Sequence, residues 1–192
     1  MLVGQPDGRV MITRAGTKRH AGALVVGQSP VERMGVTIAT DNKFGKVAVR
    51  GQRRVGTGKD ALRQEHVDQD GDSLRSLLVI AEGDHTNADL QTRAKWERLR
   101  LAGYGIRPRA NVSTWRDAGG VIWDPGRLVA IQNDVEQVFG DFTLSSASLS
   151  LTDGSGSGAG TAARLEFVDP RAHGGKAGAG KSDAVFSPGG GL

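Results

Sequence analysis

The sequence contains no cysteine, few aromatic residues and no long hydrophobic run, and each of these absences excludes a class of protein. Without cysteine, the chain cannot form a disulfide scaffold, a thiolate metal site or a thiol nucleophile. No apolar run approaches the roughly 18 residues that span a bilayer, and the first residues lack the basic and apolar segments of a signal peptide. We therefore expect a protein of the cytoplasm, or of a particle assembled there, without a membrane partner.

The composition indicates a modest folded core and no concentrated charge. Hydrophobic residues make up 38% of the 192 residues and aromatic residues 5%, which suits one compact domain or two small ones. The formal net charge is +4, and lysine and arginine are spread along the chain. Because nucleic-acid-binding proteins usually concentrate their positive charge on one element, we expect no nucleic-acid partner.

Turn residues and short alternating segments predict a β-rich protein. The segment Gln5-Pro6-Asp7-Gly8 is typical of a tight turn and predicts a hairpin at the start of the chain. Since this hairpin begins so close to Met1, we expect the sequence before it to be missing or to lie on another chain. Residues 51–73 are polar and aperiodic and predict a long exposed loop. Further strands are predicted at residues 23–26, 36–40, 46–50, 77–81, 110–115, 121–123, 128–131, 142–144, 147–151 and 163–167.

The order of these elements predicts an α+β fold. One helix is predicted over about residues 87–102, where Thr86 and Asp89 have the spacing of a capping box. A change of alternation near Ser145-Ser146 predicts a bulge in a long terminal hairpin. We therefore predict mostly antiparallel β-structure, with a small barrel and an inserted α/β unit that carries the one main helix. The barrel is assigned to residues 1–51 and 115–170, the inserted unit to 52–114, and a flexible glycine-rich tail to 171–192.

One segment of the tail matches a nucleotide-binding motif. Gly175–Ser182 has every fixed position of the P-loop pattern, which in a true site follows a buried strand and opens a helix. Only ten residues follow Ser182, and they include Pro188, so no adequate helix is expected there. A nucleotide-binding protein remains the alternative hypothesis, and it predicts calorimetric binding of Mg-ATP that is lost in Lys181→Ala.

The other candidate motifs favour solvent-exposed side chains over chemistry. The carboxylates within Asp68–Asp72 are spaced like a calcium loop, but Ser73 and Val79 stand where an EF-hand has Gly and Glu. The four histidines lie in predicted loops or near helix starts, without metal-ligand spacing: His20, His66, His85 and His173. We therefore expect an acidic turn, solvated histidines, no catalytic residue, no cofactor and no metal.

The basic stretch that begins at Arg50 has three interpretations. It could contact phosphate, line a protein interface or simply face solvent, and only phosphate binding predicts a steep dependence on salt. We favour the protein interface or solvent. The candidate interface residues are Arg50, Gln52, Arg53, Arg54 and Trp123, the last as an anchor of either an interface or the core.

Four segments in order resemble a known family of tail proteins. The first is Gly8–Gly16, and the second ends in Val49-Arg50-Gly51-Gln52. The third is the segment Arg93–Gly103, which contains Lys95-Trp96-Glu97-Arg98, and the fourth is the run Trp115–Val129. Together they resemble the C-terminal part of the phage Mu-type tail baseplate hub protein, the late-control D-like family, over about residues 5–170. The chain departs from that pattern at Asn133–Glu136, in its glycine-rich tail and in having no N-terminal half.

This resemblance implies a structural protein. Members of the family form a homotrimeric ring of barrels that joins the tail tube to a central spike, and this role requires no catalytic residue. The implied location is the tail baseplate of a virion, assembled in the host bacterial cytoplasm. The implied partners are two further copies of the chain, a spike protein, and tube and other baseplate proteins.

Overall fold

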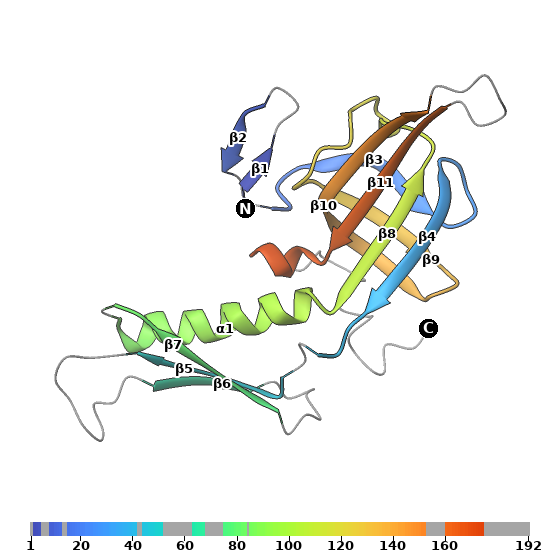
Figure 1. Ribbon diagram of the computed structural model, residues 1–192. Helices are drawn as coiled ribbons and strands as arrows, with labels where there is room; N and C mark the ends of the chain where they lie inside the picture. Colours follow the sequence, from blue (N-terminus) through green and yellow to red (C-terminus); the bar gives the residue numbers. More distant parts are fainter. Residues whose placement is uncertain are drawn as a thin grey trace. The chain divides into compact units, whose positions relative to one another are not determined.

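A computed structural model shows two units that are built from separate sheets (Figure 1). It describes residues 2–4, 8–12, 15–41, 44–51, 63–67, 75–83, 85–152 and 160–174. The first unit consists of Met1–Ala39 together with Ile106–Leu192, and the second of Thr40–Gly105. The α+β class is confirmed, with one α-helix among the described residues.

The boundaries between the units differ from those that the sequence suggested at residues 51 and 115. Strand β5 (Lys46–Gly51) pairs with two strands of the second unit, β6 (Arg63–Val67) and β7 (Ser76–Ala81). Strand β8 (Ile106–Val112) pairs instead with strands of the first unit. The boundary of each unit depends on which strands pair with each other. The local sequence patterns of β5 and β8 do not show which sheet each strand joins.

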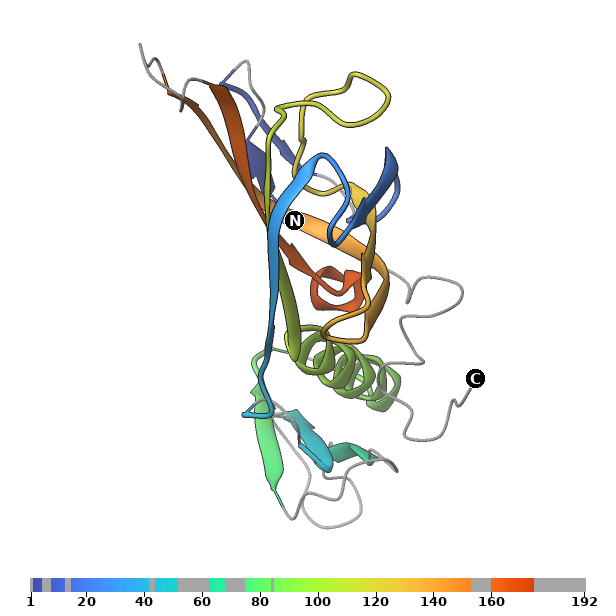
Figure 2. The ribbon, with the colours of Figure 1, turned by 90° about the vertical axis from the view of Figure 1, so that its right-hand side faces the viewer.

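The first unit is a six-stranded sheet that curls into a half-barrel. The order of its strands is β3 (Arg19–Val25), β9 (Leu128–Asn133), β10 (Val138–Thr152), β11 (Gly160–Val168), β8 and β4 (Val31–Ile38). All neighbours are antiparallel except β3 and β9, which run parallel. The curl brings β9 opposite β8 and β4 (Figure 2). A predicted hairpin is also present as β1 (Leu2–Gly4) and β2 (Val10–Ile12), and the short 3-10 helix η2 (Pro170–His173) follows β11.

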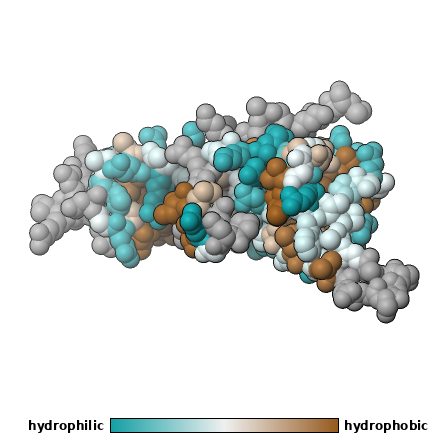
Figure 3. Space-filling view, turned by 90° about the horizontal axis from the view of Figure 1, so that it is seen from above, coloured by the Kyte–Doolittle hydropathy of each residue, from teal (hydrophilic) through white to brown (hydrophobic). Residues whose placement is uncertain are grey.

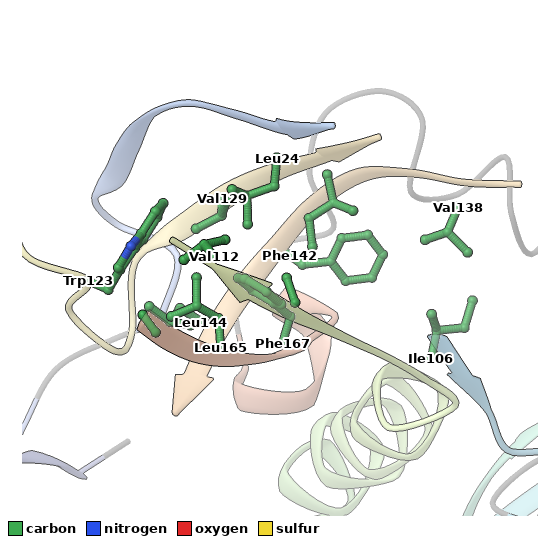
Figure 4. Close-up of a cluster of buried hydrophobic side chains, with 13 residues drawn as sticks. Leu24, Ile106, Val112, Trp123, Val129, Val138, Phe142, Leu144, Leu165 and Phe167 are labelled. Carbon is green, nitrogen blue, oxygen red and sulfur yellow. The ribbon is translucent and has the colours of Figure 1, made fainter. Parts of the chain in front are cut away.

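Alternating side chains fill the inside of the half-barrel. On β8 the residues Ile106, Ala110 and Val112 are buried, whereas Arg107 and Arg109 between them are exposed. Phenylalanine, leucine and valine side chains from the facing strands point toward one another in this core (Figure 4). Burying each large apolar side chain stabilises the fold by roughly 1.5–3 kcal/mol, so this core is the main source of the unit's stability.

The predicted bulge near Ser145-Ser146 is confirmed. The pairing of β10 with β11 shifts between Leu144 and Ser146, which leaves Ser145 as the extra residue. The hydroxyl of Ser145 donates to the carbonyl of Glu166 at 2.8 Å. The extra residue lets Leu144 and Ala147 face the same core although three positions separate them.

The second unit is a three-stranded sheet with one helix, α1 (Asn87–Gly103), and β5 is its central strand. The predicted capping box is confirmed, because Thr86 accepts from the Asp89 amide and the Asp89 carboxylate accepts from the Thr86 amide. Leu90 and Ala94 of α1 pack against the sheet in a small core with Val49.

Strand β6 lies within the stretch that the sequence marked as a loop, so that prediction is wrong for residues 63–67. The strand reads Arg-Gln-Glu-His-Val and contains almost no apolar side chain. The strand forms because it pairs with β5, since an edge strand gains backbone hydrogen bonds whatever its side chains are. Hydrophobic alternation therefore could not reveal it.

Candidate functional site

A buried histidine and aspartate form the main polar cluster of the half-barrel. His20 on β3 is 1% exposed, and Asp117 in the segment between β8 and β9 is 8% exposed. The imidazole Nδ1 lies 2.8 Å from Asp117 Oδ2. The backbone N–H of Asp124 donates to Nε2 at 3.1 Å, and the Asp124 carbonyl oxygen lies 3.3 Å from the same nitrogen. A neutral imidazole that accepts at Nε2 carries its proton on Nδ1 and donates it to the carboxylate.

The turn that presents Asp117 requires glycine at two positions. Gly120 has a φ of +79°, a conformation that other residues rarely adopt. A Cβ on Gly119 would lie 3.1 Å from the Cβ of Ala21 on β3, so only glycine lets the turn approach this strand without a shift. The sequence Asp117-Ala118-Gly119-Gly120 therefore folds as a turn that carries its carboxylate into the protein.

Hydrogen bonds keep the Asp117 carboxylate ionised. Burial alone would raise the pKa of Asp117, but bonds from His20 and from the amides of Ala21, Val121 and Gly119 outweigh burial, so its pKa is lowered. The three amides lie 2.8–3.0 Å from the carboxylate oxygens. Four donors thus converge on one side chain and tie the β8–β9 segment to β3.

The lowered pKa of Asp117 predicts a loss of stability in acid. The folded state holds this proton less tightly than the unfolded chain, whose carboxyl has the ordinary pKa of 3.8. The ionised Asp117 carboxylate therefore contributes to the free energy of unfolding above that pH. This contribution is lost as the pH falls through the lower pKa that Asp117 has in the folded state. Urea denaturation between pH 6 and about pH 2 should show the gap between wild type and Asp117→Asn shrinking in acid. A gap that stays constant over this range would contradict the assignment.

This pair is suited to holding structure and not to moving protons. In a catalytic triad the histidine nitrogen away from the carboxylate faces a nucleophile. Here that nitrogen instead faces the backbone N–H and carbonyl oxygen of Asp124, so backbone groups occupy the position that a nucleophile takes in a triad. The sequence-based expectation of four solvated histidines is wrong for His20, which lies on a strand and not in a loop. Only pairing across 97 positions gives it this partner.

The other histidines and the acidic motif add no site. His85 bonds the carbonyl of Glu82 at 2.8 Å and lies near the start of α1. His173 lies in η2, where burial lowers its pKa. The stretch Asp68–Asp72 lies outside the described residues, as does the P-loop-like segment Gly175–Ser182. In the described part of the chain, no three His, Asp or Glu side chains are grouped to hold a metal ion.

The candidate interface residues fall into three groups. Arg50 is exposed on β5. Gln52, Arg53 and Arg54 lie outside the residues that the structure describes. Trp123 is 4% exposed, and its Nε1–H donates to the Thr114 carbonyl at 3.0 Å.

The burial of Trp123 decides its role. It lies at one end of the half-barrel core, with its ring centroid 4.9 Å from that of His20 (Figure 4). A side chain that is enclosed in this way is not available to a partner. We therefore assign Trp123 to the core and not to an interface.

Exposed apolar side chains form several separate groups on the surface. In one view they appear as patches among polar residues (Figure 3). The most exposed are Val10, Ile12, Ile38, Leu78, Ile80, Val135 and Leu151. Among the described residues, no helix is both long and apolar enough to cross a membrane. Large contiguous apolar patches mark surfaces that bind other proteins, whereas single exposed apolar side chains are common on any protein surface.

The fold is that of phage tail proteins. No protein-family model matches the chain, and no curated protein matches it. Among solved structures, it is similar to the 43 kDa tail protein of prophage MuSo2 from Shewanella oneidensis, at 24% identity and a TM-score of 0.74. That match covers 90% of this chain and 50% of the tail protein.

Two further structures support the same fold. The tail protein of Neisseria meningitidis MC58 matches at 23% identity and a TM-score of 0.70, covering 88% of this chain and 52% of that one. A protein in the virion of a native gene transfer agent matches at 13% identity and a TM-score of 0.54, covering 94% of this chain and 35% of that one. The chain therefore spans about half the length of the two tail proteins and shares their fold over that half.

Proposed function

We propose that this chain is a structural subunit of a phage-type tail, and specifically of the baseplate hub. In this proposal three copies form a ring that joins the tail tube to a central spike. The observation that carries it is the match to the MuSo2 tail protein, which extends over 90% of the chain and so includes both units. The ordered sequence motifs that resemble the Mu-type hub family support the same role.

The second unit offers a surface that suits protein contacts. Leu78 and Ile80 of β7 are 50% and 59% exposed, on the face of the strand opposite Val79, which packs into the core of the unit. Ile80 lies beside the exposed Arg50 in the parallel pairing of β5 with β7. Arginine is enriched in protein interfaces, and the fully buried centre of an interface is more apolar than the rest of the surface. We assign this face to contacts with other tail proteins, with Arg50 at its edge.

The proposed role is non-enzymatic. Among the described residues, the buried His20–Asp117 pair contacts the backbone of Asp124 and holds the β8–β9 segment in place. A hub subunit acts through its interfaces, so its essential residues are those that hold the fold and those that face partners. We place the protein in assembled particles, with spike and tube proteins as its neighbours.

Labelling of particles tests this function directly. An antibody to the chain, carrying gold, is applied to purified tails from a strain that expresses it, and the label should lie at the tip of the tail. The matched control is the same preparation from a strain in which the gene is deleted, which should have no label and no complete tails. Complete tails without the protein would contradict the proposal.

A further inference from the structure

The outer face of the half-barrel carries a cluster of arginines. Arg107 and Arg109 alternate with the buried residues of β8 and therefore point away from the core. On one side, Arg33 of β4 pairs with Asn111, and on the other side Arg164 of β11 pairs with the same Asn111. Because directly paired residues share a face, the four arginines lie together on three adjacent strands. We call Arg33, Arg107, Arg109 and Arg164 the arginine face.

Three of these four arginines have no ion-pair partner among the residues that the structure describes. Arg109 forms an ion pair with Glu166, with 3.4 Å between Nε and Oε1. Within the described residues, Arg33, Arg107 and Arg164 form no ion pair. Elsewhere in the same unit, Arg19 and Arg127 do pair with carboxylates. The arginine face is therefore a place where positive charge accumulates.

Gly35 is a position without a side chain on the arginine face. Gly35 of β4 pairs with Arg109 and so belongs to the same face. A Cβ at Gly35 would meet nothing within 4 Å, so the space above it is open. Arg33 and Thr37 lie two positions away on either side of Gly35 along the strand. The arginines therefore flank a position that has no side chain and has open space above it.

The same unit carries a turn with exposed acidic side chains, whose charge is opposite to that of the arginine face. The turn between β9 and β10 presents Asp134, Val135 and Glu136, and all three are exposed. Val135 is 81% exposed, so most of its side chain is available to a partner. We call Asp134, Val135 and Glu136 the acidic knob.

Hydrogen bonds fix the shape of the acidic knob. The Asn133 side-chain oxygen accepts from the amides of Val135 and Glu136 at 3.1 and 3.0 Å, and its side-chain nitrogen donates to the Glu136 carboxylate at 2.8 Å. Gln137 has a φ of +55° and donates to the Asp134 carbonyl at 2.6 Å. A turn held in this way loses little conformational entropy when it docks, and such preorganisation favours binding.

We propose that the acidic knob of one copy docks on the arginine face of the next copy, with Val135 over Gly35 and the carboxylates against the unpaired arginines. This proposal rests on the proposed ring and names the contact that builds it. The two surfaces are different, so the contact is head-to-tail, and head-to-tail contacts close into rings when the rotation permits. Charge complementarity within one chain favours a second copy over a foreign partner.

A nucleic acid is the other polyanion that the arginine face could attract. Phosphate binding would require only the arginines, and would leave the acidic knob with its exposed valine without a role. The face also lacks exposed aromatic side chains on which bases could stack. These features favour the protein partner, and the experiment includes nucleic acid as an opposing outcome.

Charge reversal tests the contact through light scattering over a range of concentrations. The variants Asp134→Lys/Glu136→Lys and Arg107→Glu/Arg164→Glu should each weaken self-association by at least about tenfold, because like charges then face each other. A chain that carries all four substitutions should associate nearly as wild type does, because the charges are complementary again. All four side chains are exposed, and unchanged thermal unfolding serves as the control for folding.

Disulfide trapping tests the geometry, which is possible because the chain has no cysteine of its own. Val135→Cys is mixed with Gly35→Cys under mild oxidation, and a cross-linked dimer should form. The matched control replaces Gly35→Cys by Gln28→Cys, an exposed position in the turn before β4, and should give no cross-link above background.

The outcomes separate this contact from the ring itself. A trimer without the Val135–Gly35 cross-link, and without any effect of charge reversal, overturns the contact and leaves the ring in place. A monomer that also fails to cross-link overturns both proposals. A third outcome is salt-sensitive binding of a DNA duplex that is lost in Arg107→Glu/Arg164→Glu while self-association is unchanged. That outcome overturns the contact and indicates that the arginine face binds phosphate.

Discussion

Asp117→Asn should lower the free energy of unfolding by about 2–4 kcal/mol, although it changes only one atom of the side chain. The Asp117 carboxylate accepts four hydrogen bonds, from His20 and from the amides of Ala21, Gly119 and Val121. An asparagine amide places an NH2 group where one oxygen was, so that donors face donors in a buried site. The turn would then lose its tie to β3, and the β8–β9 segment should open first.

Urea denaturation at neutral pH measures this loss, and hydrogen exchange locates it. The matched control is Asp134→Asn, because Asp134 is an exposed carboxylate on a turn of the same unit and its side chain has no such set of donors. That variant should differ from wild type by less than about 0.5 kcal/mol. If Asp117→Asn were as stable as the control, the four bonds would not hold the segment as described.

Trp123→Ala should be at least as damaging, with a cost of about 3–5 kcal/mol. Trp123 is 4% exposed and closes one end of the half-barrel core, so alanine leaves a cavity that the sheet cannot fill. The change also removes the indole donor from the Thr114 carbonyl and the ring contact with His20. Thermal unfolding should report the cost as a lower midpoint.

Trp123→Phe separates packing from hydrogen bonding. Phenylalanine keeps much of the ring volume and loses the bond to Thr114, so it should cost clearly less than alanine does. An interface role for Trp123 makes the opposite prediction, with unchanged unfolding and weaker self-association. That pattern would contradict the core assignment.

The elements that could be predicted from sequence are those with a local signal. The capping box of Thr86 and Asp89 depends on residues three positions apart, so it marks the start of α1 without knowledge of the fold. The bulge near Ser145-Ser146 follows from a change of parity within one strand. In each case a short window of sequence holds all the interacting residues.

The elements that could not be predicted depend on distant partners. Strand β6 has a polar sequence and is ordered by pairing with β5. His20 finds Asp117 only because β3 joins the sheet beside β9, which is a parallel pairing across a long connection. Nothing near His20 in the sequence signals a carboxylate partner. The glycines around Asp117 were a local signal for a turn, but they did not show that the turn carries its carboxylate inward.

The arginine face was hidden for a related reason. Arg33, Arg107 and Arg164 are far apart in the sequence, and along the chain they look like dispersed charge. Only the register of β4, β8 and β11 places them together. The basic run at Arg50–Arg54, in contrast, is contiguous and can be seen in the sequence alone.

The mass of the protein in solution tests the central claim, that this chain is a self-associating structural subunit, most directly. Size-exclusion chromatography with light scattering should give about three times the chain mass of 20.2 kDa, with a shift toward smaller species at high salt. A mass of 20.2 kDa at every concentration and salt would contradict the claim that this chain forms the ring.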